Sequence, residues 1–469
     1  MTPRESRLTR DPFRHAKRLA TGRGQPNRSS TSRATDPTPV PCRRCGPAVG
    51  SCHTSNKSFC NSRGTASQHR PCEEGNPMND STLSRRSLIL GAAGAAGLAT
   101  GALGVTAPAS AGRARAARPP LWKLAKPNGL AFGTSLATWH MPDTDYLDLV
   151  GREATLLFTE DDLLWYRLKP TPDAELDFSY ADQIIGYAES QRMRVFGAHL
   201  VWDEGFGEGW TEDDLWGLGE REARELLFGT AEAVVRRYRG RVDAWSVANE
   251  VTSPEGQRGF RTDVPWWETI GPSYVAEAFQ VAHDADPSAV LVLNEFGFET
   301  VNEYGDEPGP RRRATLQVID RLLADGVPVH ALGVQAHLLA DRFADRFAAR
   351  AYLNWFSEVA DRGLDILITE LDVLDDGLPA DVAVRDAAVA DVYRRYLDVA
   401  LSHRAVKAVM AFGLTDRYTW LEEDYPREDG APRRPLAYDD ELAAKPAYRA
   451  IANRLEAAPR RSPLWTIPA

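Results

Sequence analysis

The sequence predicts a single closed (β/α)8 barrel, the TIM-barrel form of the α/β class, as the body of this 469-residue chain. From residue 130 onward, short apolar runs rich in Val, Leu, Ile and Phe alternate with longer stretches of helical periodicity. This alternation is typical of successive β/α units. Eight such runs can be counted, and a body of this length fits one barrel better than an open sheet.

The eight runs are the expected strands of the barrel. In chain order they cover residues 130–136, 154–159, 194–201, 242–249, 289–296, 329–337, 364–372 and 406–413. Between them, segments such as 180–192 and 382–401 carry apolar residues three and four positions apart. That spacing suits helices that pack around the outside of the strands.

The first 77 residues differ from the body. They hold all five cysteines and 14 Lys/Arg against 5 Asp/Glu, with few large apolar side chains. We expect residues 1–77 to be a disordered extension or the product of an upstream mis-start, with translation beginning at Met78. Cys42 and Cys45 form one C-x-x-C, but no second ligand pair at zinc-finger spacing accompanies it, so we expect no metal site there.

Residues 78–111 have the parts of an export signal. The basic pair Arg85-Arg86 precedes a Gly/Ala-rich apolar run, and the segment closes on Ala109-Ser110-Ala111. These parts predict a twin-arginine-type signal peptide, a secreted protein and a mature domain over residues 112–469. The alternative is a membrane anchor, but Gly and Ala supply little apolar surface to hold a helix in a bilayer.

The charge of the body limits its partners. Residues 112–469 carry 40 Lys/Arg against 60 Asp/Glu, a net charge of −20. A nucleic-acid partner would need clustered cations, so we expect none. No metal cluster or phosphate loop is visible in the sequence, and we therefore expect no cofactor. We also expect no membrane contact after removal of the signal, and a monomer.

Two glutamates stand at the ends of expected strands. Glu250 closes the fourth run and Glu370 lies near the end of the seventh, where side chains reach the catalytic face of a barrel. Each could simply form an ion pair at its strand end. Two carboxylates that face each other across a barrel mouth are also what glycosidic cleavage needs, one to donate a proton and one to attack the anomeric carbon.

Five motifs surround these glutamates in a fixed order. They are Gly197-Ala198-His199-Leu200-Val201-Trp202, Trp245-Ser246-Val247-Ala248-Asn249-Glu250, Gly333-Val334-Gln335-Ala336-His337, Leu364-Asp365-Ile366-Leu367-Ile368-Thr369-Glu370-Leu371-Asp372-Val373 and Gly413-Leu414-Thr415-Asp416-Arg417-Tyr418-Thr419-Trp420. Together they resemble the family-10 glycoside hydrolases, the endo-β-1,4-xylanases and their relatives, from about Gly133 to Tyr448. The resemblance implies a retaining enzyme that cleaves β-1,4-xylosidic bonds in a xylan-type polysaccharide.

The resemblance also implies roles for single residues. Glu370 is expected to be the nucleophile and Glu250 the acid/base, with their carboxyl groups about 5–5.5 Å apart. His337 is expected to hold Glu370 in its attacking orientation, and Asn249 to bind the sugar 2-hydroxyl. Expected to support them, by contact with Glu250 or with the substrate, are Gln335, His199, Trp202, Glu160 and Trp420. For the tryptophans and histidines, plain core packing is the alternative.

Four positions depart from the family pattern. Asp161 stands where the family has Asn, Leu164 where it has Lys, Asp203 where it has His and Phe412 where it has Trp. These changes fall around the sugar and not on the two glutamates. They leave two alternatives open: the same chemistry on another β-glycan, and a polysaccharide-binding barrel with little turnover.

Overall fold

The computed structural model describes residues 118–302 and 304–465. These residues form the predicted barrel, in which each strand pairs in parallel with its neighbours and β10 pairs with both β1 and β9 to close the ring. The eight strands of the ring are β1 (Ala131–Leu136), β2 (Leu156–Thr159), β3 (Arg194–Gly197), β4 (Ala244–Asn249), β6 (Val290–Glu295), β7 (Ala331–Val334), β9 (Asp365–Leu374) and β10 (Val406–Ala411). The fold prediction is therefore confirmed.

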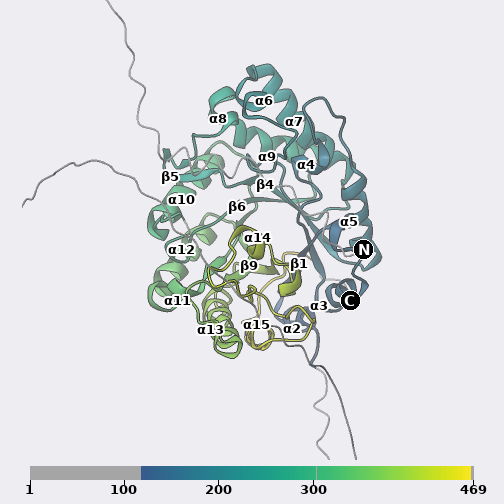
Figure 1. Cartoon of the computed structure of the whole chain (residues 1–469). Coiled ribbons are helices and arrows are strands. Elements are labelled where there is room, and N and C mark those ends of the chain that lie inside the picture. Colours follow the sequence, from purple (N-terminus) through teal and green to yellow (C-terminus); the bar gives the residue numbers. More distant parts are fainter. Residues whose placement is uncertain (1–117, 303, 466–469) are drawn as a thin grey trace, which may run out of the picture. The chain divides into compact units, whose positions relative to one another are not determined.

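Helices surround the strands (Figure 1). The two segments expected to be helical, 180–192 and 382–401, correspond to α5 and α13. The longer helices are α3 (Thr144–Glu153), α5 (Ser179–Ser190), α7 (Glu220–Arg237), α9 (Tyr274–Ala285), α10 (Pro308–Ala324), α12 (Ala349–Asp361), α13 (Val382–Ala400) and α15 (Pro446–Ala457). The short ones are α2 (Leu121–Ala125), η1 (Lys126–Asn128), η2 (Thr138–His140), α4 (Trp165–Leu168), α6 (Glu212–Trp216), α8 (Pro265–Thr269), α11 (Ala340–Arg346), η3 (Asp416–Tyr418) and α14 (Leu421–Asp424).

Three strand boundaries differ from the sequence prediction. The third run, expected to reach residue 201, ends as a strand at Gly197. The sixth run, expected as one strand over 329–337, divides into β7 and β8 (His337–Leu339), because Ala336 adopts a φ of 63°, which interrupts extended backbone. An additional strand, β5 (Thr252–Gln257), lies in the loop after β4 and was not predicted.

The strands bury side chains on both faces. The outer face packs against the helices, and the interior of the barrel is filled by a smaller apolar cluster: Ala131, Leu156, Phe158, Phe196, Ala198, Ala244, Val292, Ala331, Leu367, Ala408 and Met410. Side chains two residues apart share a face of a strand. The interior face therefore continues from Val292 to Asn294 and from Leu367 to Thr369, toward the carboxyl ends of the strands. The core thus leads directly into the catalytic face.

The expected extension over residues 1–77 and the expected signal peptide over residues 78–111 lie outside the described residues. The expected catalytic domain, 112–469, is described from residue 118 to residue 465, apart from residue 303. None of the helices in this described part combines the length and the apolar composition that a bilayer crossing requires.

Candidate active site

The two glutamates lie directly after β4 and in the carboxyl-terminal half of β9. Glu250 follows β4 directly, and its φ of 56° is unusual for a residue other than glycine. Its backbone N–H donates to the carbonyl of Asn294 at 3.0 Å, which ties this conformation to β6. Glu370 lies within β9 and is only 5% exposed. A short turn of backbone therefore carries Glu250, whereas regular strand carries Glu370.

Three buried amide side chains connect the two carboxylates. Gln335 Nε2 donates to Glu250 Oε1 at 3.0 Å and also reaches Asn249 Oδ1 at 3.3 Å. Asn294 Nδ2 donates to the same Asn249 oxygen at 2.8 Å and to Glu370 Oε1 at 2.7 Å. The amides thus form a continuous chain of hydrogen bonds from one carboxylate to the other. Because the three amide side chains are buried, the two glutamates belong to one site with little freedom to move apart.

Glu370 is held on its second oxygen by His337. The imidazole Nε2 lies 3.2 Å from Glu370 Oε2, and Nδ1 lies 2.9 Å from Asp372 Oδ1. Burial opposes protonation of His337, but the charges and hydrogen bonds of Asp372 and Glu370 outweigh it and raise its pKa well above the ordinary histidine value. A protonated imidazole donates from both nitrogens. His337 can therefore donate to Glu370 Oε2 and to Asp372 Oδ1 at the same time.

Trp420 belongs to the same network. Its indole Nε1 donates to Asp372 Oδ2 at 2.7 Å, and its ring centroid lies 5.0 Å from that of His337. Asp372 thus accepts from His337 on one oxygen and from Trp420 on the other. The structure brings Trp420 to the site as expected from the sequence, with its ring oriented by a buried carboxylate.

His199 and Trp202 lie on the β3 side of the site. His199 is 8% exposed, its Nδ1 lies 2.7 Å from Ser246 Oγ, and its ring is 5.4 Å from that of Trp202. Burial lowers the pKa of His199, although the charges of Glu370 and Glu250 act in the opposite direction. The imidazole is thus near both carboxylates and is favoured in its neutral form.

Glu160 follows β2, the strand that pairs with β3. Ser135 Oγ donates to Glu160 Oε2 at 2.8 Å. Burial, together with the negative charges of Asp161, Asp162 and Glu370, raises the pKa of Glu160 to about 8. The carboxyl is therefore largely protonated at neutral pH and can donate a hydrogen bond as well as accept one.

The four departures from the family pattern have identifiable surroundings. Asp203 forms an ion pair with Arg261 at 2.5 Å, and Arg261 Nη1 also donates to the backbone carbonyl of Glu250 at 3.4 Å. Phe412 lies between His337 and Phe158, with ring centroids 5.5 and 5.7 Å away. It therefore lines the wall of the site.

Asp161 and Leu164 follow Glu160 by one and four positions in the chain. Asp161 accepts from the indole of Trp139 at 3.0 Å and also hydrogen-bonds the hydroxyl of Tyr166. Leu164 is 8% exposed. Where the family pattern has two polar side chains, this chain therefore has one carboxylate already bonded to protein donors and one buried hydrocarbon.

Sequence reasoning gave no role to three residues of the site. Asn294 lies near the end of the fifth run, Asp372 closes the seventh, and Arg261 lies in the loop after β4. Asn294 carried a usable signal, because a polar residue two positions after an inward-facing apolar one must also point inward. Arg261 carried none, since its partner Asp203 is 58 positions away.

A glycine explains why Asn294 fits between the strands. A Cβ on Gly333, its neighbour on β7, would lie 2.2 Å from Asn294 Oδ1. Only glycine leaves room for that side chain.

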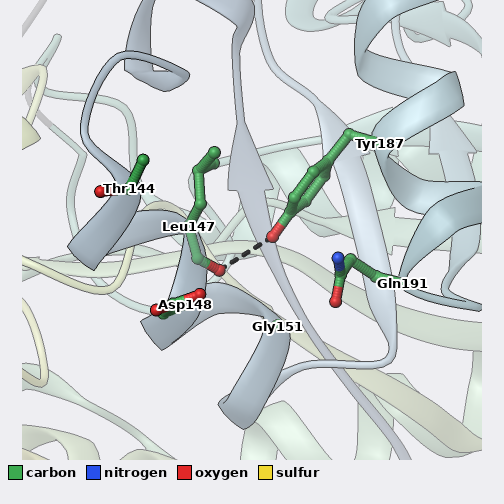
Figure 2. A pocket seen from close by; sticks show the side chains of 6 residues that line it. All are labelled: Thr144, Leu147, Asp148, Gly151, Tyr187 and Gln191. Atoms are coloured by element: carbon green, nitrogen blue, oxygen red, sulfur yellow. Dashed lines mark hydrogen bonds between the residues drawn. The ribbon is translucent and has the colours of Figure 1, made fainter.

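A separate hollow of about 250 Å³ lies on the outer helices (Figure 2). Its walls come from α3, α5 and the residue after α5, and Tyr187 donates across it to the carbonyl of Leu147 at 2.9 Å. Its lining residues are Thr144, Leu147, Asp148, Gly151, Tyr187 and Gln191. It contains none of the site residues expected from the sequence. Throughout residues 118–302 and 304–465, no group of three or more His, Cys, Asp or Glu side chains has the arrangement of a metal site.

Comparisons with known proteins identify the family of the chain. Residues 121–454 match the model of glycosyl hydrolase family 10. Endo-1,4-beta-xylanase B of Thermotoga neapolitana is 30% identical over 331 residues, which cover 70% of this chain and 88% of that protein. Exoglucanase XynX of Acetivibrio thermocellus is 28% identical over 339 residues, 70% of this chain but only 29% of that much longer protein.

A solved structure shares the fold. The crystal structure of native xylanase 10B from Thermotoga maritima superposes with a TM-score of 0.63 at 28% sequence identity, covering 72% of this chain and 98% of that one. The family match extends over most of the described barrel and includes both strand-end glutamates. The chain therefore belongs to glycosyl hydrolase family 10.

Proposed function

We propose that this protein is a retaining, endo-1,4-β-xylanase-like glycosidase that hydrolyses β-1,4-xylosidic bonds by double displacement. The observation that carries the proposal is the unbroken hydrogen-bond chain from Glu250 through Gln335, Asn249 and Asn294 to Glu370. Catalytic pairs need fixed geometry and opposite protonation states. A network of buried donors that ends on both carboxylates supplies the geometry.

In the first step, a carboxylate oxygen of Glu370 attacks the anomeric carbon while the bond from that carbon to the leaving oxygen breaks. Glu250 gives its proton to the leaving oxygen, so the aglycone departs as a neutral alcohol. Asn294 and His337 keep Glu370 oriented, because each donates to one of its oxygens. The product of this step is a covalent glycosyl-enzyme.

In the second step, Glu250 accepts a proton from water, whose oxygen attacks the anomeric carbon and displaces Glu370. Two inversions give net retention, and both carboxyl groups return to their starting states. Asn249 keeps its Nδ2 for the sugar, because its Oδ1 already accepts from Asn294 and Gln335. That nitrogen is suited to the sugar 2-hydroxyl, whose hydrogen bond strengthens in the transition state.

Proton NMR of the first products tests this proposal. We expect xylan and xylo-oligosaccharides to release the β-anomer first, with the α-anomer appearing only by mutarotation. The Glu370→Gln variant should release essentially no product. Early appearance of the α-anomer would mean inversion and would reject double displacement.

A second substrate class has a specific observation in its favour. The departures at Asp161 and Leu164 change the glycone side, and one relative of this chain bears the name exoglucanase. Hydrolysis rates on a substrate panel that includes xylan, β-1,4-glucan and aryl glycosides distinguish a xylan-type substrate from another β-glycan. Faster cleavage of cello-oligosaccharides than of xylo-oligosaccharides would move the preferred substrate to another β-glycan. Calorimetric binding of either series without hydrolysis would favour a polysaccharide-binding barrel instead.

We also propose that the protein is exported and acts outside the cell as a monomer. The support is the twin-arginine-type segment over residues 78–111, with Arg85-Arg86 and the Ala109-Ser110-Ala111 end. Mass spectrometry of the culture medium should find peptides from the region after Gly112. A peptide from residues 1–77 in the exported material would contradict the assignment of Met78 as the start.

A further inference from the structure

Trp139 is an exposed aromatic side chain at the mouth of the barrel. It lies in η2, directly after β1, and 39% of its surface is open to solvent. A single exposed aromatic side chain is common on protein surfaces, so exposure alone does not indicate a site. Trp139 is distinguished by its position directly after the carboxyl end of β1, on the catalytic face of the barrel, and neither proposed catalytic step uses it.

Three contacts fix the orientation of the indole. Its Nε1 donates to Asp161 Oδ2 at 3.0 Å. Its ring lies over that of His140, with centroids 3.7 Å apart and planes 31° from parallel, and meets the ring of Tyr418 edge-on at 5.5 Å. The rings of His140 and Tyr418 also contact each other, with centroids 4.9 Å apart, so both lie toward one side of the indole. The protein therefore already holds the exposed ring in one orientation. Binding of a ligand to it would cost little additional side-chain entropy.

Both neighbours of Trp139 lead into the active site. Asp161 follows Glu160 in the chain, and Tyr418 precedes Trp420 by two residues. The strand before η2 also contributes, because Ser135 of β1 donates to Glu160. Trp139 thus lies between the Glu160 side and the Trp420 side of the site, on the same catalytic face of the barrel.

The surroundings of Asp161 and Leu164 show how these two departures change the contacts offered to a sugar. Asp161 accepts from Trp139 and from Tyr166, so part of its hydrogen-bonding capacity is already used by protein donors. Leu164 is buried and offers no hydrogen bond. Polar contacts to a glycone-side sugar are therefore reduced at these two positions, while an oriented aromatic face is present beside them.

We propose that Trp139 is a stacking platform for a pyranose ring of the substrate chain, on the glycone side beyond the sugar that reacts at Glu370. The inference rests on the proposed function, because it assigns a binding contact within the same site. The C–H face of a β-linked pyranose is apolar and flat, and it gains free energy when it covers an aromatic ring. The ligand class is thus an unbranched β-1,4-linked chain of neutral pyranoses.

Aryl β-glycosides of one, two and three xylose units isolate the glycone side, because the aryl group occupies the aglycone side in every case. The measured quantity is the increase in kcat/KM when a sugar is added. We expect Trp139→Ala to reduce one of the two increases about tenfold, the factor expected when roughly half an aromatic side chain's burial is lost. Trp139→Phe, which keeps a ring without the N–H, should lose less.

Trp216 provides the matched control. It is 44% exposed on the outer helix α6, and Trp216→Ala should leave both increases unchanged. Equal increases in the parent, Trp139→Ala and Trp139→Phe would overturn the platform, and so would an equal loss in Trp216→Ala. Melting temperatures of all variants show that the comparison is made on folded protein.

A failure of the proposed function gives a different result. In that case the parent itself hydrolyses none of the aryl xylosides. Calorimetry with xylo- and cello-oligosaccharides of one to four units then tests the platform directly. A gain in affinity with length that Trp139→Ala removes supports it, and equal length dependence in parent and variant overturns it.

Discussion

Replacement of Asn294 tests the network that joins the two carboxylates. The side chain is fully buried, and its Nδ2 donates to Glu370 at 2.7 Å and to Asn249 at 2.8 Å. Its Oδ1 accepts from the hydroxyl of Thr369 at 2.8 Å. Asn294→Ala removes all three bonds without touching either glutamate. The variant therefore separates positioning of Glu370 from the chemistry of Glu370 itself.

The magnitude follows from the bonds that are lost. A hydrogen bond to a carboxylate contributes about 1.5–3 kcal/mol, and the neutral bond to Asn249 about 1 kcal/mol. If about 2–3 kcal/mol of this appears in the activation barrier, kcat/KM falls about 30- to 150-fold. The fold should also lose stability, because the buried hydroxyl of Thr369 loses its acceptor and Asn249 Oδ1 keeps only the longer bond from Gln335.

The assay is kcat/KM on xylo-oligosaccharides together with the melting temperature. Asn128 offers a matched control, since its amide also donates two hydrogen bonds, to the carbonyls of Leu455 and Glu456, outside the site. Asn128→Ala should lower stability and leave kcat/KM unchanged. A folded Asn294→Ala variant with kcat/KM within threefold of the parent would refute the positioning role of this network.

Two further predictions use charged groups of the site. Glu160 has a pKa of about 8 in the fold and 4.5 ordinarily, so the folded state holds a proton that the unfolded chain releases, and stability falls as pH rises from 4.5 to 8. Glu160→Gln should therefore raise the melting temperature more at pH 8 than at pH 5, and an equal change at both would contradict this. Asp203→Asn leaves Arg261 less neutralised beside Glu250, which favours ionised Glu250. The alkaline limb of the kcat/KM profile should move to lower pH, and an unmoved limb would show that Arg261 does not influence the proton donor.

Much of the fold could be predicted because barrel strands are buried on both faces. Such strands read as continuous apolar runs, and all eight predicted runs contain a strand of the ring. The errors occur where backbone geometry interrupts an apolar run. Ala336 is apolar like its neighbours, yet its φ of 63° ends β7 and turns Gln335 and His337 to their different partners. Composition does not reveal such a turn.

The active site also has a part that the sequence predicts and a part that it does not. Residues carried by strand-end motifs, such as Glu250 and Glu370, could be assigned from the sequence. Contacts across the site could not, because they depend on loops brought together by the closed barrel. The ion pair of Asp203 with Arg261 and the hydrogen bond from Trp139 to Asp161 both join separate β/α units. A change that looks like a lost sugar contact in the sequence is, in the fold, a new contact within the protein.

The central claim is that Glu370 forms a bond to the sugar. A 2-deoxy-2-fluoro xylobioside with a good leaving group slows the second step more than the first, so the glycosyl-enzyme accumulates. Mass spectrometry of peptides from the inactivated protein should find one sugar adduct on Glu370, and none in the Glu370→Gln variant. An adduct on another residue, or full turnover of the probe without any adduct and with inverted product, would contradict the account.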